Sequence, residues 1–183
     1  MRIDLATNAA TCLYFGRVLE ELDDITCDLE SREKEIQRSP LALLNIVFEA
    51  NGSHTERYRQ ERDIDVCVME RETGTSSFIH GGSLAPGDVM NYEGLTRELH
   101  ALDAKLLFLD GVMNWEIAAG KFIQETYKVL SELRAARGLT PLQVSQEQPL
   151  KDSLNYHLNL SSLRRFQAQT LQKRVQTQLG VVS

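Results

Sequence analysis

Three aspartates near the start of the chain come closest to a catalytic motif. Asp23, Asp24 and Asp28 stand at i, i+1 and i+5 of a segment with helical spacing, so one helix can bring their carboxylates onto a shared face. Carboxylates grouped in this way can hold Mg²⁺ against a diphosphate. The motif therefore raises two interpretations, a Mg²⁺-dependent enzyme that acts on a diphosphate and a solvated acidic face.

All-helical terpene synthases use such an aspartate cluster, which makes an isoprenoid diphosphate the substrate class to consider. Those enzymes carry a second metal-binding motif, an Asn/Asp-Asp with Ser and Glu at helical spacings, and this chain has no counterpart of it. At 183 residues the chain is also short for that fold. A solvated acidic face is the favoured interpretation, and we expect no enzymatic activity.

The other residue types that do chemistry lack the spacing that they would need. The four histidines form neither an HExxH nor a Glu-x-x-His pattern. Ser76 and Ser77 have no Gly-x-Ser-x-Gly context, and Gly81-Gly82 lacks the Gly-Lys-Ser/Thr of a phosphate loop. No catalytic residue is proposed.

Apolar residues recur at helical spacing along the chain and predict the elements that must position any site. Their steps of 3 and 4 residues form a coiled-coil seam: Tyr92, Leu95, Leu99, Leu102, Leu106, Leu109 and Met113. The seam continues beyond Met113, where Glu116 and Gly120 occupy positions that would normally be apolar. A polar group at such a position often fixes register or partner number, and a glycine permits close approach of a neighbour or a kink.

The whole pattern predicts an all-α fold, an elongated bundle of long antiparallel helices with coiled-coil-like packing. Ser39-Pro40 supplies a helix cap and a first-turn proline, and Gly138 with Pro141 supplies a stop signal. Asn51-Gly52 predicts a kink or a break. We expect a single domain over residues 1–183, with a loop at 73–88 and helices at about 9–37, 40–72, 89–137 and 149–182.

Composition and charge narrow the classes of function. The chain is 42% hydrophobic and 25% charged, as in ordinary folded proteins. No apolar run approaches the roughly 18 residues of a membrane span, the start of the chain has no signal-peptide pattern, and three widely spaced cysteines fit reduced thiols. The net charge of −6, concentrated in the first 72 residues, argues against a nucleic acid partner.

Four short stretches of the predicted helices carry a resemblance to a known family. They are Pro40-Leu-Ala-Leu-Leu44, Met69-Glu-Arg-Glu-Thr-Gly74, Leu99-His-Ala-Leu-Asp103 and Arg174-Val-Gln-Thr-Gln-Leu179. From Pro40 onward the chain resembles the cytosolic region of fungal CorA-like divalent-cation transporters. In that family, long antiparallel helices pack against a final stalk helix that leads into the first of two membrane spans.

The resemblance implies that this chain is the cytosolic regulatory and assembly part of a CorA-like Mg²⁺ transporter. It further implies a location on the cytoplasmic side of a membrane, a homo-oligomer formed through helix seams, and attachment through a C-terminal region that the chain lacks. The helical pattern runs to Val182 without a cap, so we expect a fragment whose last helix continues. A stand-alone helical interaction or adaptor protein is the alternative, and the Mg²⁺-dependent isoprenoid-diphosphate enzyme comes third.

Candidate cation positions follow from charge and spacing. In the transporters that the chain resembles, Mg²⁺ bound between cytosolic subunits helps to keep the pore closed. Asp63 and Asp65 lie near Glu61, and Asp103 and Asp110 stand one heptad apart. Because Mg²⁺ prefers few carboxylates and several retained waters, we expect any site at these four aspartates to be weak.

Overall fold

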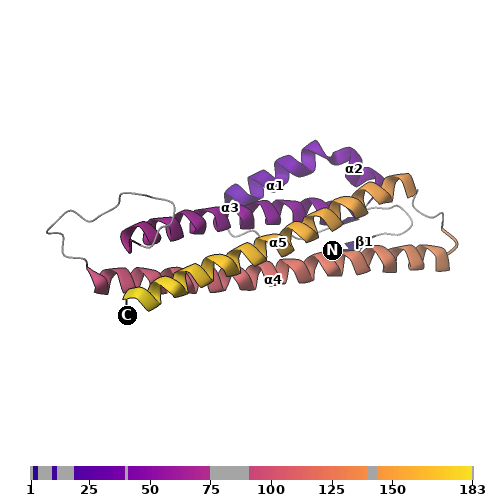
Figure 1. Ribbon diagram of the computed structural model, residues 1–183. Coiled ribbons are helices and arrows are strands. Elements are labelled where there is room, and N and C mark those ends of the chain that lie inside the picture. The colour runs from indigo at the N-terminus through magenta and orange to yellow at the C-terminus, as the bar shows by residue number, and fades with distance from the viewer. Residues whose placement is uncertain are drawn as a thin grey trace. The chain divides into compact units, whose positions relative to one another are not determined.

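The computed structural model describes residues 2–3, 10–11, 19–39, 41–74, 91–139 and 144–182. Helices make up nearly all of this part of the chain (Figure 1), so the all-α prediction is confirmed. A pair of two-residue antiparallel strands, β1 (Arg2–Ile3) and β2 (Ala10–Thr11), precedes them. The helices are α1 (Leu19–Ser31), α2 (Glu33–Arg38), α3 (Ala42–Glu72), α4 (Tyr92–Ala136) and α5 (Val144–Val182).

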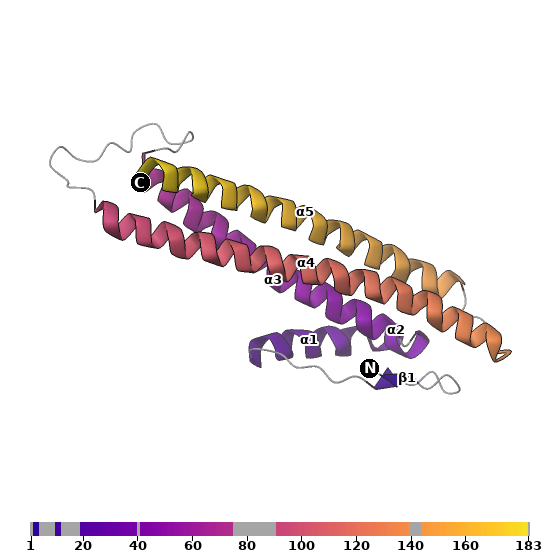
Figure 2. The same ribbon diagram turned by 90° about the horizontal axis from the view of Figure 1, so that it is seen from below.

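The residues fall into two compact units. Each of the helices α3, α4 and α5 has one part in the first unit and another part in the second unit. The first unit comprises Met1–His54 and Trp115–Ser161, and the second unit comprises Thr55–Asn114 and Ser162–Ser183. In both units α4 runs antiparallel to α3 and α5, as Figures 1 and 2 show. The single-domain prediction stays a prediction.

The predicted seam of α4 is the centre of the core in the second unit. Leu99, Leu106 and Met113 are fully buried, and Leu95, Leu102 and Leu109 are nearly so, whereas Tyr92 at the start of the helix is 57% exposed. These side chains pack with apolar residues of α3 and α5: Val66, Met69, Ala168, Leu171 and Val175. The 3,4 spacing therefore located the core of this unit correctly, except at Tyr92.

The core of the first unit joins the start of α3 to the later part of α4 and the early part of α5. Its buried members are Leu41, Ala42, Phe48, Ile123, Tyr127, Leu130, Leu150 and Leu154. Ile36 of α2 packs against this cluster. The short second helix is thus held in the unit by apolar packing.

The first predicted helix, 9–37, is wrong in its extent. Ala10–Thr11 is a strand, and the helical segment is divided into α1 and α2 at Arg32, whose φ of −110° and ψ of 20° leave the helical range. The Arg32 guanidinium binds Glu35 of α2 and Glu49 of α3. Such a contact with α3 is tertiary, so periodicity within residues 9–37 does not reveal the break.

Two other expected helix boundaries also differ. α3 continues through Asn51-Gly52, where Asn51 Nδ2 donates a hydrogen bond to the Val47 carbonyl at 2.9 Å and Gly52 is buried. α5 begins at Val144, so Pro149 lies inside the helix and does not open it. A proline inside a helix removes one backbone hydrogen bond, and α5 nevertheless continues through Pro149 to Val182.

The predicted stop signal at the end of α4 is confirmed. Gly138 has a φ of 64°, in the left-handed region that glycine adopts without strain. The Leu139 amide donates to the Arg134 carbonyl at 3.0 Å and the Gly138 amide to the Ala135 carbonyl at 3.1 Å. These two bonds form a Schellman cap.

Candidate functional site

A guanidinium joins α5 to α3 in the second unit. Arg174 Nε and Nη2 each donate to one oxygen of the Glu70 carboxylate at 2.7 Å, and Nη1 donates to Asp63 Oδ1 at 3.3 Å. Two parallel charge-assisted bonds of this kind fix geometry as well as adding energy. The hydrogen bond to Glu70 raises the pKa of Arg174, so this side chain remains a permanent cation.

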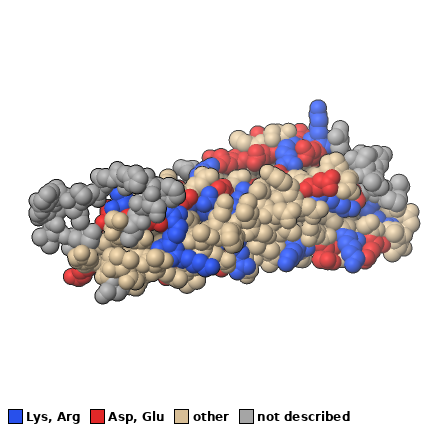
Figure 3. Space-filling view, in the orientation of Figure 1, with Lys and Arg blue, Asp and Glu red and all other residues tan. Residues whose placement is uncertain are grey.

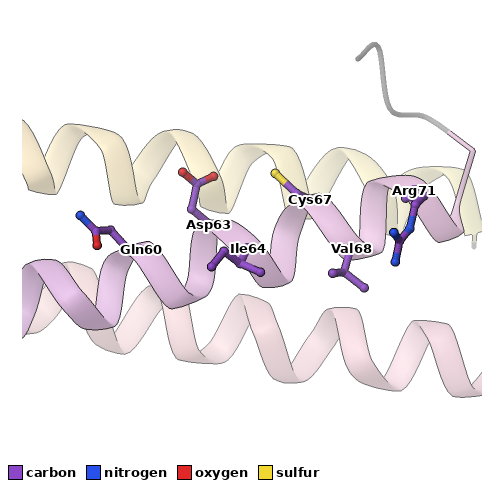
Figure 4. A pocket seen from close by; sticks show the side chains of 6 residues that line it. All are labelled: Gln60, Asp63, Ile64, Cys67, Val68 and Arg71. Carbon is purple, nitrogen blue, oxygen red and sulfur yellow. The ribbon is translucent and has the colours of Figure 1, made fainter. Parts of the chain in front are cut away.

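An open groove of about 420 Å³ adjoins this ion pair on α3. Figure 4 shows the lining side chains, with Asp63 and Cys67 on the side of α5 and Val68 on the side of α4. Arg174 Nη2 donates to Cys67 Sγ at 3.6 Å, and the cysteine is exposed. The groove thus holds one exposed thiol, and the Arg174 guanidinium that contacts this thiol is already engaged by two carboxylates.

The acidic residues of α3 that meet α5 stand seven residues apart. Glu56 lies 3.4 Å from Arg164 of α5 and accepts hydrogen bonds from Arg59 of its own helix, while Asp63 and Glu70 meet Arg174. The hydrogen bond from Arg59 lowers the pKa of Glu56. These charges set the register between α3 and α5 within the second unit.

A second guanidinium joins α5 to α4 in the same unit. Arg165 donates to Asp110 through Nε at 2.9 Å and through Nη2 at 3.3 Å, and Gln169 Nε2 donates to the same carboxylate at 2.8 Å. The hydrogen bond from Arg165 is the main cause of the lowered pKa of Asp110. α5 is therefore tied by ion pairs to both of its neighbours in the second unit.

All four predicted cation positions lie in the second unit, and each already has a protein partner. Asp63 and Asp110 face the arginines described above, Asp65 lies 3.3 Å from Arg62, and Asp103 accepts a hydrogen bond from Gln176 at 3.4 Å. Among the residues that the structure describes, no three or more His, Cys, Asp or Glu side chains are grouped to hold a metal ion. The four aspartates are thus not gathered into one site.

The aspartates of the sequence motif lie along α1, where Figure 3 shows the acidic side chains. Asp23, Asp24 and Asp28 are all exposed. Asp24 Oδ2 lies 3.8 Å from Nε2 of His54. Their exposure agrees with a solvated acidic face.

The remaining residues considered for chemistry are dispersed. His100 is exposed, and His157 Nε2 lies 3.7 Å from Oε1 of Glu49. His80, Ser76-Ser77 and Gly81-Gly82 lie outside the described residues. The histidines that are described therefore belong to separate surroundings.

A buried polar cluster in the first unit was missed by the sequence analysis. Asn45 is fully buried, donates to the Leu150 carbonyl at 2.7 Å and accepts from the Tyr127 hydroxyl at 3.3 Å. Desolvation, together with the negative charge of Glu147, raises the pKa of Tyr127. The sequence feature that could have revealed this cluster is a single amide side chain, Asn45, within the apolar stretch from Leu41 to Phe48.

The two irregular seam positions of α4 lie in the core of the first unit. Glu116 is 3% exposed and accepts a hydrogen bond from Ser161 Oγ at 2.5 Å. A Cβ placed on Gly120 would lie 2.8 Å from both Leu158 Cδ1 and Phe48 Cζ. Of the two expected roles of this glycine, close approach of neighbours is therefore the one that the structure shows.

One face of α4 in the first unit carries large apolar side chains that no described element covers. Trp115 is 67% exposed and Phe122 68%, with Val129 and Leu133 about half exposed. The first three stand seven residues apart. The sequence analysis did not identify this face, because the buried seam of the same helix dominated the pattern.

No family model, curated protein or solved structure matches this chain. The resemblance to CorA-like transporters stays a prediction. Within the described part of the chain, no helix has the length and apolar character required to cross a membrane.

Proposed function

We propose that this chain is the helical regulatory and assembly part of a CorA-like divalent-cation transporter. The observation that carries the proposal is the attachment of α5, through Arg174 to Glu70 in α3 and through Arg165 to Asp110 in α4. A cytosolic part that acts on a membrane region through its last helix needs that helix coupled to the others. Paired, charge-assisted hydrogen bonds supply such a coupling.

Cation sensing would involve the same contacts that attach α5 to α3 and α4. Asp63 and Asp110 are candidate Mg²⁺ positions and also bind the two arginines of α5. Mg²⁺ at either carboxylate would compete with a guanidinium for the same oxygens. Mg²⁺ would thereby change how firmly α5 is held by its neighbours.

Thermal unfolding tests the Mg²⁺ part of the proposal. An ion that binds only the folded state stabilises it by about 1.4 kcal/mol at ten times its dissociation constant, so Mg²⁺ should raise the Tm above that in salt of equal ionic strength. Asp103→Ala and Asp110→Ala should each reduce this Mg²⁺-dependent shift, and Glu93→Ala, at an exposed carboxylate of α4, is the control. Identical melts with and without Mg²⁺ would refute cation sensing by this chain.

The sequence encoded after Ser183 tests the transporter assignment itself. The proposal expects about 20 apolar residues that begin within a few positions of Ser183, followed by a Gly-Met-Asn-like turn and a second apolar span. A stop codon directly after Ser183 would overturn it.

A stand-alone helical interaction protein is the second candidate. The observation that favours it is the exposed apolar face of α4 around Trp115 and Phe122, because rows of exposed apolar side chains mark interaction surfaces. The third candidate is an isoprenoid-diphosphate enzyme that uses Asp23, Asp24 and Asp28. A diphosphate-release assay with Mg²⁺ would test it.

A further inference from the structure

Glu49 of α3 lies where three elements of the first unit meet. Its Oε2 accepts a hydrogen bond from Arg32, which stands between α1 and α2, and its Oε1 accepts one from Ser153 Oγ of α5 at 2.5 Å. Nε2 of His157, one turn further along α5, lies 3.7 Å from Oε1 of Glu49. The Glu49 side chain is only 18% exposed, so water and salt screen these contacts weakly.

The charges around Glu49 do not balance while His157 is neutral. Arg32 is shared with Glu35 of α2, to which its Nε and Nη2 donate hydrogen bonds at 3.0 and 2.8 Å. We call Arg32, Glu35, Glu49 and His157 the Glu49 cluster. One guanidinium and two carboxylates leave it with one excess negative charge, and an unbalanced charge in a partly buried group costs free energy.

Other titratable groups around this cluster come from α4 and α5: Glu116, Tyr127, Glu147, Lys151 and Tyr156. Lys151 lies 3.0 Å from Glu147, so these two charges balance each other. Glu116 accepts a hydrogen bond from Ser161, whose Oγ lies 3.0 Å from the His157 carbonyl oxygen. Desolvation raises the pKa of Tyr127, and the negative charges of Glu147 and Glu49 raise it further. The field of Glu49 therefore extends into the core of the first unit.

A proton on His157 would balance the Glu49 cluster. A histidine changes its charge between about pH 5 and pH 8. At 3.7 Å the ring nitrogen is too far from the carboxylate for a hydrogen bond, so a neutral imidazole attracts Glu49 weakly. An imidazolium at the same place attracts the carboxylate through its charge. Proton binding therefore favours the arrangement in which α5 lies against α3.

We propose that His157 and Glu49 form a pH-sensitive contact that holds α5 against α3 in the first unit more firmly at about pH 6 than at about pH 8. The inference goes beyond the proposed transport role, because it concerns protons and the first unit, and it holds equally for a stand-alone interaction protein. The stabilisation requires the charged ring, so it is present in mildly acidic solution and is lost as the pH rises towards 8. If α5 leads into a membrane region, this contact couples that helix to pH.

Thermal unfolding of the full 183-residue chain measures this stabilisation. The rise in Tm from pH 8 to pH 6 should be about 1–4 °C larger in the unchanged chain than in His157→Gln, which keeps a polar side chain without a titrating group. His100→Gln, at an exposed histidine of the second unit, is the matched control and should leave the rise unchanged. His54→Gln should remove less than half as much of the rise as His157→Gln, because Asp24, 3.8 Å from His54, is 57% exposed and screened by water.

Variants of the two charged partners separate an electrostatic role from simple packing. Glu49→Gln removes the charge with little change in shape, so adding His157→Gln to it should not reduce the rise in Tm any further. Arg32→Gln leaves the cluster with a second excess negative charge and should enlarge the rise. Equal rises in the unchanged chain, His157→Gln and Arg32→Gln would overturn the proposal.

Amide hydrogen exchange tests the contact in the unchanged chain, without any variant. After correction for the intrinsic effect of pH on exchange, residues 150–161 of α5 should exchange at least about twofold more slowly at pH 6 than at pH 8. Corrected exchange that is equal at the two pH values, or slower at pH 8, would also overturn the proposal.

Discussion

Arg174 of α5 and Glu70 of α3 form a bidentate ion pair, with both donor–acceptor distances at 2.7 Å. The Glu70 side chain is only 13% exposed, whereas that of Arg174 is 32% exposed. Partial burial reduces screening by water, and the planar guanidinium matches the carboxylate in both position and orientation. Together with the contacts at Glu56 and Asp63, this ion pair therefore sets how α5 lies along α3 in the second unit.

Arg174→Ala should lower the free energy of unfolding by about 1–2 kcal/mol, because it leaves Glu70 without its main partner. Arg174→Lys should recover only part of this loss, since an ammonium cannot form both parallel bonds. Urea denaturation measures the difference. Arg97→Ala removes a fully solvated pair with Glu93 and should change stability by less than about 0.5 kcal/mol; equal losses for the two alanine variants would contradict the prediction.

Gly120→Ala should destabilise the protein by about 1–3 kcal/mol, although alanine favours helix. The added methyl group would lie 2.8 Å from Leu158 and Phe48, so one of them must move. Gly111→Ala is the matched control in the same helix, where a Cβ has no neighbour within 4 Å, and it should stabilise the protein by about 0.5–1 kcal/mol. Thermal melts of both variants provide the test, and a shift of the same sign in both would refute the packing argument.

Asn45→Ala should cost about 1–3 kcal/mol, because it removes a buried hydrogen bond to the Leu150 carbonyl and the acceptor of the Tyr127 hydroxyl. Tyr127→Phe should cost less, about 0.5–1.5 kcal/mol, since it deletes one bond with little change in shape. Chemical denaturation of both single variants and the double variant gives a coupling energy. Additive losses would mean that the two side chains act independently.

The free energy of unfolding should fall in acid, and protonation of the Asp110 carboxylate should account for part of this loss. Its pKa in the folded protein is lowered from 3.8, chiefly by the hydrogen bond from Arg165, while the unfolded chain has the ordinary value. The stabilisation is therefore complete well above pH 4 and is lost as the pH falls through the lowered pKa of the folded state. Asp110→Asn should reduce the dependence of Tm on pH in this range, and an unchanged acid limb would contradict the assignment.

Local periodicity was sufficient for the class of fold and for much of the core. A helix repeats every 3.6 residues, so the positions of Leu99, Leu106 and Met113 in the sequence already place them on one face. The same reasoning singled out Gly120 as a point of close approach or a kink, and the structure shows the first of these. It failed at Arg32, where a contact with Glu49 of α3 accompanies the break between two helices.

The candidate site was less accessible to sequence reasoning. The spacing of the carboxylates indicated Asp63 and Asp110 as candidate positions for a cation. The structure gives them Arg174 and Arg165, which are more than 50 residues away in the chain. No pattern within one helix can state which residue of another helix lies opposite.

The sequence by itself determined that the chain is helical, where α4 ends, and that α4 presents apolar residues in seven-residue steps, because these properties depend on neighbours within a few turns. The tertiary structure alone decided which apolar face is covered. Leu130 is buried while the adjacent Val129 is half exposed, although both belong to regular apolar rows. Periodicity shows that a face is apolar, but only packing between distant segments determines whether another helix covers it.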